Sequence, residues 1–170
     1  MAEEIIHIID DEPIIHEVLG DLLTSEGFDT EISSGGEEAL KKFDSQSYGL
    51  VLLDLLMPGM DGMEVLERVK TAEPNLPVVM LTATKTVRTA VEAMKLGAFD
   101  YLTKPFDVEE VRLVVERATK TAELVEEVNR LRSEVRTRFS LQNIVARSPR
   151  MQSVLETVRT IAPLKTTVLI

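Results

Sequence analysis

Short apolar runs alternate with amphipathic segments over the first hundred residues of the chain. The apolar runs, rich in β-branched residues, predict five strands: Ile5–Ile9, Phe28–Ser33, Gly49–Leu53, Pro77–Leu81 and Asp100–Thr103. Apolar residues at helical spacing predict four helices between them: Ile14–Ser25, Glu37–Phe43, Met63–Thr71 and Val87–Leu96. Strands that alternate with helices indicate an α/β fold, with a doubly wound parallel sheet covered by helices on both faces.

The first predicted helix carries a continuous apolar stripe, made of Ile14, Ile15, Val18, Leu19, Leu22 and Leu23. A much longer helical segment, without Gly or Pro, runs from Asp107 to about Arg138. At 1.5 Å per residue it would be roughly 48 Å long, so its second part is expected to project beyond the sheet. Its first part is expected to cover the sheet edge with Val111, Val114, Val115 and Ala118.

The projecting part has the pattern of a parallel two-stranded coiled coil. Its apolar residues follow a 4-3-4 spacing, with Val at the a positions and Leu at the d positions: Leu124, Val128, Leu131 and Val135. Glu127 at g would pair with Arg132 at e of the partner helix. We therefore expect a homodimer through this linker helix, although the repeat covers only about two heptads. The alternative is a single amphipathic helix packed on its own chain.

Composition and charge narrow the classes of function. The chain has no Cys, which excludes disulfides, zinc–thiolate sites and thiol nucleophiles. No apolar stretch approaches the roughly 20 residues that span a bilayer, and the acidic N-terminus lacks signal-peptide features, so a cytoplasmic protein without membrane contact is expected. Residues 1–106 hold 20 acidic and 8 basic residues, a net charge of −12, and residues 107–170 bring the total to −10. The acidic balance of residues 1–106 argues against nucleic-acid binding by that part of the chain.

The candidate chemistry lies where the predicted strands end. In an open parallel sheet, ligands bind beyond the carboxyl ends of the strands. Five polar side chains stand at those ends: Asp10, Asp11, Asp54, Thr82 and Lys104. Clustered carboxylates favour a hard cation such as Mg²⁺, and a cation with an ammonium beside a carboxylate suits the transfer of a phosphoryl group to that carboxylate. Asp54 is the best nucleophile, whereas His7 and His16 are assigned to structure or surface.

These residues resemble the receiver domain of bacterial response regulators, through "DD", "LLDLLMPGMDG", "LTA" and "YLTKPF" in this order. The resemblance covers about Ile5 to Thr119 and implies a flavodoxin-like strand order of 2-1-3-4-5. It implies that Asp54 accepts a phosphoryl group from a histidine kinase, and that Lys104 pairs with this group. The bond from Lys104 to Pro105 is often cis in this family.

The same resemblance implies a metal site and a switch. Mg²⁺ would be held by Asp11, Asp54 and the backbone carbonyl of Leu56, with Asp10 acting mostly through water. Thr82 and Tyr101 would form the switch pair: the hydroxyl moves to the phosphoryl group and the ring follows inward.

Leu56 and Thr84 should flank the phosphoryl group. Leu56 cannot orient an attacking water, so we expect slow self-dephosphorylation, and faster decay in Leu56→Asn.

The last residues, "IVARSPRMQSVLETVRTIAPLKTTVLI", resemble the start of the AAA+ ATPase domain of sigma-54-dependent activators of the nitrogen-regulator type. Ser148 suits an N-cap and Pro149 a first helical position, and "TTVLI" begins a strand. In that family a phosphate-binding loop follows, so we expect a fragment without ATPase activity. The expected organisation is a receiver domain over 1–119, a linker helix over 120–139 and the start of the AAA+ domain over 140–170.

These features favour a phosphorylation-dependent module that controls an AAA+ ATPase by rearranging its dimer. Whether phosphorylation breaks an inhibitory dimer or forms an activating one is left open, with a preference for the first. A second hypothesis is an Asp-nucleophile phosphohydrolase, although Leu56 stands where such enzymes commonly carry a second Asp. A third is a scaffold that acts without phosphorylation, and the complete set of site residues counts against it.

Overall fold

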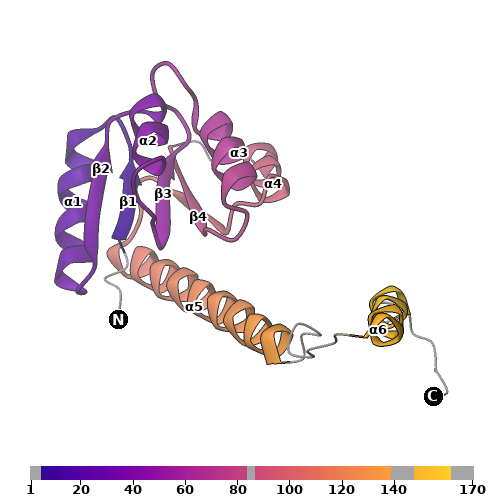
Figure 1. Cartoon of the computed structure of the whole chain (residues 1–170). Coiled ribbons are helices and arrows are strands. Elements are labelled where there is room, and N and C mark those ends of the chain that lie inside the picture. The colour runs from indigo at the N-terminus through magenta and orange to yellow at the C-terminus, as the bar shows by residue number, and fades with distance from the viewer. Residues whose placement is uncertain (1–4, 84–86, 139–147, 162–170) are drawn as a thin grey trace. The chain divides into compact units, whose positions relative to one another are not determined.

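The structure, a computed structural model, describes residues 5–83, 87–138 and 148–161 (Figure 1). Its centre is a parallel sheet of β1 (Ile5–Ile9), β2 (Asp29–Ser33), β3 (Leu50–Asp54), β4 (Val78–Thr82) and β5 (Asp100–Thr103). The strand order is β2-β1-β3-β4-β5, as the resemblance implied. Every residue of β3 and β4 is buried, because helices cover both faces of the sheet.

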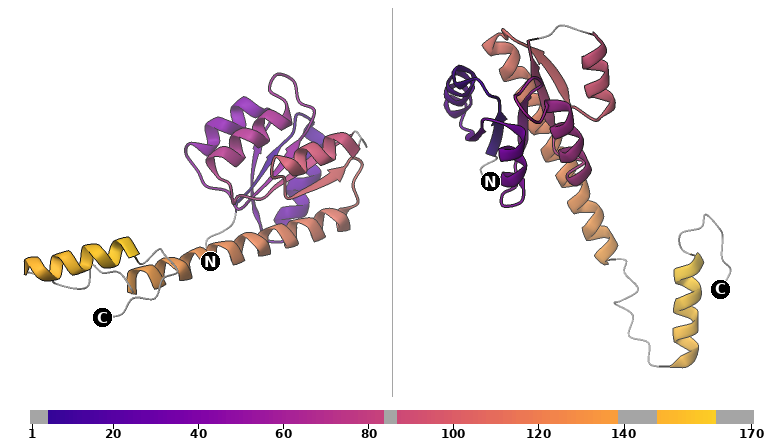
Figure 2. Two further views of the ribbon diagram at one scale, coloured as in Figure 1. Left: turned by 90° about the vertical axis from the view of Figure 1, so that its right-hand side faces the viewer. Right: turned by 90° about the horizontal axis from the view of Figure 1, so that it is seen from above.

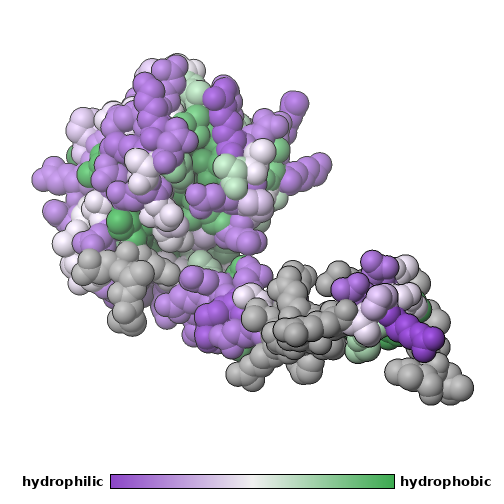
Figure 3. All heavy atoms as spheres, in the orientation of Figure 1, coloured by the Kyte–Doolittle hydropathy of each residue, from purple (hydrophilic) through white to green (hydrophobic). Residues whose placement is uncertain are grey.

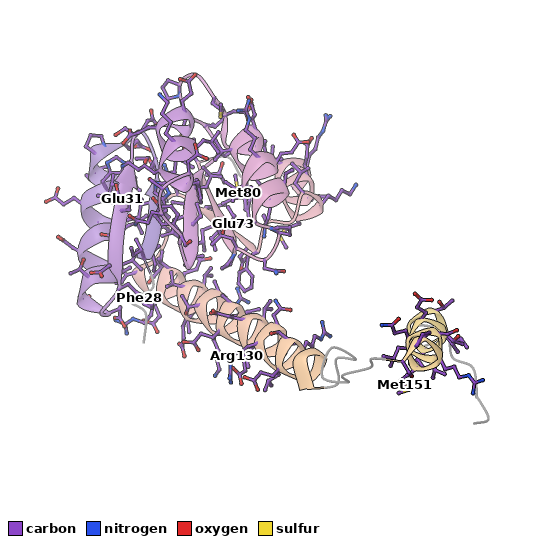
Figure 4. All side chains as sticks on the ribbon, in the orientation of Figure 1. Phe28, Glu31, Glu73, Met80, Arg130 and Met151 are labelled. Carbon is purple, nitrogen blue, oxygen red and sulfur yellow. The ribbon has the colours of Figure 1, made fainter. Side chains whose placement is uncertain are left out.

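Five helices belong to this part of the chain: α1 (Pro13–Ser25), α2 (Gly36–Phe43), α3 (Gly62–Ala72), α4 (Val87–Lys95) and α5 (Val108–Arg138). The helices α2, α3 and α4 contribute Ala39, Val65, Leu66 and Ala93 to one apolar cluster. On the opposite face, α1 and α5 contribute Leu19, Leu23, Val111 and Val115 to a second cluster, which Phe28 joins at the start of β2 (Figures 2 and 4). The doubly wound α/β fold is therefore confirmed.

One expectation about helix packing needs correction. The first part of α5 covers a face of the sheet beside α1, not its edge, because Val111, Val115 and Ala118 pack against side chains of β1, β3, β4 and β5. The apolar stripe of α1 is also wider than its buried face. Leu19 and Leu23 are buried, whereas Ile14 and Val18 are exposed.

By its contacts the chain divides into two compact units, Met1–Glu126 and Glu127–Ile170. The second unit contains the end of α5 and the amphipathic helix α6 (Pro149–Ile161). The Ser148 hydroxyl accepts a hydrogen bond from the Met151 N–H at 3.3 Å, so the predicted N-cap of α6 is confirmed. The predicted strand "TTVLI" lies outside the described residues. Among the helices that the structure describes, none has the length and apolarity needed to cross a membrane.

Candidate functional site

The carboxyl ends of four strands bring the predicted residues together at one edge of the sheet. Asp10 directly follows β1, Asp54 ends β3, Thr82 ends β4 and Lys104 directly follows β5. The parallel register places Asp54 beside Leu81, and Thr82 beside Thr103. The site is thus assembled from segments far apart in the sequence, as the strand-end rule predicted.

Lys104 is the centre of the charge arrangement at this edge. Its Nζ lies 2.7 Å from Asp10 Oδ2, 3.0 Å from Asp54 Oδ1 and 2.9 Å from Glu12 Oε1. Its side chain is only 10% exposed, so its pairs with the buried Asp10 and Asp54 are shielded from water, whereas the Glu12 side chain is 54% exposed. Although burial alone disfavours the ammonium, hydrogen bonds with the three carboxylates raise the pKa of Lys104 above its ordinary value. The ammonium therefore stays charged and aimed at Asp54.

Asp54 is buried, with only 3% of the residue exposed, and each of its two carboxyl oxygens faces a different donor. Oδ1 faces Lys104, and Oδ2 accepts a hydrogen bond from the Leu56 N–H at 3.1 Å. Burial raises the pKa of Asp54, while the contact with Lys104 opposes that rise. A carboxylate held in this way is oriented and poorly hydrated, which are properties of a nucleophile.

Oxygen atoms of Asp10, Asp11 and Asp54 lie within 4.8 Å of one another. Asp10 is buried and its Oδ1 accepts a hydrogen bond from the Glu12 N–H at 2.9 Å, whereas Asp11 is exposed. Hard carboxylate oxygens, one of them open to solvent, are the donor set that suits a hydrated Mg²⁺ ion. The residues present therefore fit the metal that the resemblance implied.

Thr82 and Tyr101 lie on neighbouring strands, in line with a switch pair. Thr82 is buried, and its carbonyl accepts a hydrogen bond from the Lys104 N–H at 2.6 Å. The Tyr101 hydroxyl lies 3.3 Å from Thr89 Oγ1 on α4, and the ring is partly buried against the cluster beneath α3 and α4. Thr84 lies outside the described residues. The peptide bond between Lys104 and Pro105 is cis.

Glu12 contacts Lys104 from the start of α1, although it was not among the residues predicted for the site. The two residues are 92 positions apart, and a Glu at a helix start has an ordinary role near the positive end of the helix dipole. In the sheet, β3 and β4 separate β5 from β1, and the two residues meet because the Lys104 side chain reaches past Asp54 at the end of β3 to Asp10 and Glu12. His16 likewise contacts the site through Nε2, at 2.6 Å from the Asp10 carbonyl oxygen.

A groove of about 640 Å³ lies elsewhere, between α2 and α3, with Leu40, Phe43, Met60 and Val69 among its lining residues. In Figure 3 an apolar strip is visible on this side of the molecule between projecting charged side chains. Asp54 is not among the described residues that line the groove.

Comparison with known proteins identifies the family. The response regulator receiver domain family matches residues 6–116. Regulatory protein AtoC of Escherichia coli is 36% identical over 163 residues, which is 96% of this chain and 35% of AtoC. DNA-binding transcriptional regulator NtrC of the same species is 40% identical over 118 residues, which is 69% of this chain and 25% of NtrC. This chain thus spans only about a third or less of these relatives.

A solved structure is similar to this chain in fold. NtrX from Brucella abortus in complex with ADP has a TM-score of 0.71 at 33% identity, covering 94% of this chain and 34% of NtrX. The family match covers the sheet, the carboxylate rim and the helices up to the first part of α5. The chain therefore belongs to the response regulator receiver domain family and is related to the NtrC, AtoC and NtrX regulators.

Proposed function

We propose that this chain is the phosphorylation-dependent regulatory module of a sigma-54-dependent activator, and that Asp54 accepts a phosphoryl group from a histidine kinase. The observation that carries the proposal is the buried Asp54 carboxyl, 3.0 Å from the Lys104 ammonium and within the cluster of Asp10 and Asp11. Membership of the receiver family supports it.

The chemistry follows from this geometry. A carboxylate oxygen of Asp54 attacks the phosphorus of a phosphohistidine, the P–N bond breaks, and the imidazole nitrogen retains the electron pair and takes up a proton. Lys104 stabilises the charge that develops on the phosphoryl oxygens, because its ammonium already points at the carboxylate. Asp11, Asp54 and the Leu56 carbonyl would hold Mg²⁺, with Asp10 acting through water. The ion would supply further positive charge at the transferring group.

The proposed response begins at Thr82. Its hydroxyl would move to the new phosphoryl group, and the Tyr101 ring would follow inward, which requires Tyr101 to leave Thr89 on α4. The proposed organisation is a receiver domain over 1–119, a dimerising linker over 120–139 and the start of an AAA+ domain over 140–170. The linker would carry the change to that ATPase domain, and no catalysis beyond the receiver's own phosphorylation and dephosphorylation is proposed for this chain.

The test is intact mass spectrometry of the 170-residue chain incubated with acetyl phosphate and Mg²⁺. We expect one added phosphoryl group in the wild type and none in Asp54→Asn, which keeps the shape of the side chain but removes the nucleophilic charge. Chelation of the metal should suppress the addition. A phosphoryl group on Asp54→Asn, or sustained turnover of a phosphate ester by the wild type, would refute the assignment. We also expect Asp54 to lose the phosphoryl group slowly in the wild type and faster in Leu56→Asn. Leu56 is 59% exposed, so its replacement should not disturb the core.

A further inference from the structure

Three carboxylates share one ammonium at the rim. Asp10, Glu12 and Asp54 each place an oxygen within 3.0 Å of Lys104 Nζ. The ammonium donates a hydrogen bond to Glu12 Oε1 and has Asp10 Oδ2 and Asp54 Oδ1 at ion-pair distance, so carboxylate oxygens surround it on the side of the site. An incoming phosphoryl oxygen can pair with Lys104 only if one carboxylate gives up its place.

The three carboxylates differ in how easily they can release the ammonium. Asp10 is fully buried and has no access to water that would replace the contact. Asp54 is the residue that would carry the new phosphoryl group, so it remains next to Lys104. The Glu12 side chain is 54% exposed, and its carboxylate is hydrated as soon as it turns away. Glu12 is therefore the partner that is released at the lowest cost.

The local backbone explains why the Glu12 side chain is available for this contact. Glu12 is the N-cap residue of α1, with its backbone extended at φ −92° and ψ 112°. Its carbonyl accepts hydrogen bonds from Ile15 and His16, and its N–H donates to Asp10 Oδ1. Hydrogen bonds thus hold both the carbonyl and the N–H of Glu12. Its side chain makes no capping hydrogen bond and contacts Lys104 instead. The carboxylate can leave Lys104 without disturbing either the helix start or Asp10.

We propose that Glu12 is a positioning residue that occupies Lys104 in the unphosphorylated site and releases it when a phosphoryl group arrives. The inference rests on the proposed function of Asp54. Glu12 stabilises the ground state through a contact that the phosphorylated state gives up, and its negative charge also opposes an anionic donor. Removing the carboxylate therefore speeds phosphorylation.

The experiment compares initial rates of phosphorylation by acetyl phosphate at saturating Mg²⁺, followed by intact mass. Glu12→Gln keeps the size of the side chain and should be about two- to fivefold faster than wild type, the effect of losing an ion pair of a half-exposed carboxylate. Glu12→Asp keeps the charge but shortens the reach, and should also be faster. The matched control is Glu17→Gln, which removes the same charge from the exposed face of α1, where the described residues give Glu17 no ion pair; its rate should equal that of wild type.

A second readout requires neither donor nor metal. The ¹⁵N ammonium resonance of Lys104, assigned by its loss in Lys104→Met, should exchange its protons with water faster in Glu12→Gln than in wild type. An unchanged or slower phosphorylation rate in Glu12→Gln would overturn the proposal, and so would an equal acceleration in Glu17→Gln. Absence of phosphorylation in the wild type would instead contradict the function proposed for Asp54, so the two failures are distinguishable.

Discussion

His7 lies in the middle of β1, fully buried between aromatic rings. Its ring stacks on Tyr48 with centroids 4.4 Å apart and lies 5.3 Å from Phe43. Nε2 and the Ser33 hydroxyl oxygen are 2.9 Å apart, while Nδ1 has no hydrogen-bond partner within the part of the chain that the structure describes. Burial, with the nearby Lys42 ammonium, lowers the pKa of His7 to about 4. The assignment of His7 to the structure, and not to a metal site, agrees with this environment.

This histidine makes the stability of the receiver unit depend on pH. The unfolded chain takes up a proton on His7 near pH 6.5, whereas the folded chain does so only near pH 4, so stability is lost as pH falls through this window. The free energy at stake is about 3 kcal/mol. We expect His7→Gln to show a flatter decline of unfolding free energy between pH 7 and pH 4.5 in urea titrations. Parallel declines in the two proteins would contradict the prediction.

Site residues could be predicted from the sequence where their position follows from the strand that carries them. Asp10, Asp54 and Thr82 occupy strand ends, and the rule for parallel sheets is sufficient to gather them. It fails for Glu12, because its contact with Lys104 depends on side-chain conformation at the corner between α1 and β5. No periodicity or motif in the sequence encodes that contact.

At the scale of elements, the packing of α3 against the end of β3 leaves no space. The Gly62 N–H donates to the Leu55 carbonyl at 3.0 Å. A Cβ on Gly62 would lie 2.2 Å from the Asp54 carbonyl oxygen and 2.8 Å from Leu55 Cα. Both neighbours are backbone atoms, so the strand that carries Asp54 would have to move. Only glycine allows the helix to begin this close to the backbone of Asp54.

We therefore expect Gly62→Ala to lower the free energy of unfolding by at least about 2 kcal/mol and to slow phosphorylation of Asp54. The matched control is Gly20→Ala in α1, where a Cβ meets nothing within 4 Å. That change should be neutral or stabilise the protein by up to about 1 kcal/mol, because alanine is the better helix former. Urea unfolding of both variants gives the comparison. Equal stability of the two variants would show that the α3 start can shift without cost.

Strand and helix boundaries were predicted to within one or two residues, since apolar periodicity and Gly or Pro positions define them locally. The neighbours of each helix were harder to predict. The apolar residues of α5 were found correctly, but their pattern does not say whether they meet the edge or the face of a sheet. In α1, Ile14 and Val18 belong to the same stripe as Leu19 and Leu23 yet lie outside the core.

At the scale of the whole molecule, the a and d positions of the proposed coiled coil differ along α5: the early ones contact the receiver domain and the later ones are exposed. Val114 occupies an a position but is buried in the receiver core. Arg117 at the next d position forms an ion pair with Asp100 and lies over the Phe99 ring. From Leu124 onward the stripe is exposed, at Leu124, Val128 and Leu131. Arg130, shown in Figure 4, pairs within the helix with Glu127 and Glu134, so the predicted pair between Glu127 and Arg132 has a competitor.

The exposed stripe gives a prediction for the assembly. Leu131→Glu places a charge at a d position and should reduce the particle mass in light scattering from that of a dimer to that of a monomer. The control is Leu113→Glu, another exposed leucine of α5, on the receiver part of the helix, which should leave the dimer intact. A dimer that dissociates in the control but not in Leu131→Glu would place the interface on the receiver unit.

The continuity of α5 has a mechanical consequence. The helix runs from Val108 to Arg138 in 31 residues, and its last fully buried residue is Ala118. The 20 residues beyond form a rod of roughly 30 Å, with no Gly or Pro at which it would bend. A tilt of about 10° at the sheet displaces the tip of such a rod by roughly 5 Å, the rise of nearly one helical turn. We therefore predict that the helix acts as a lever arm, in which a sub-ångström repacking of Val111, Val115 and Ala118 is enlarged at the far end of α5.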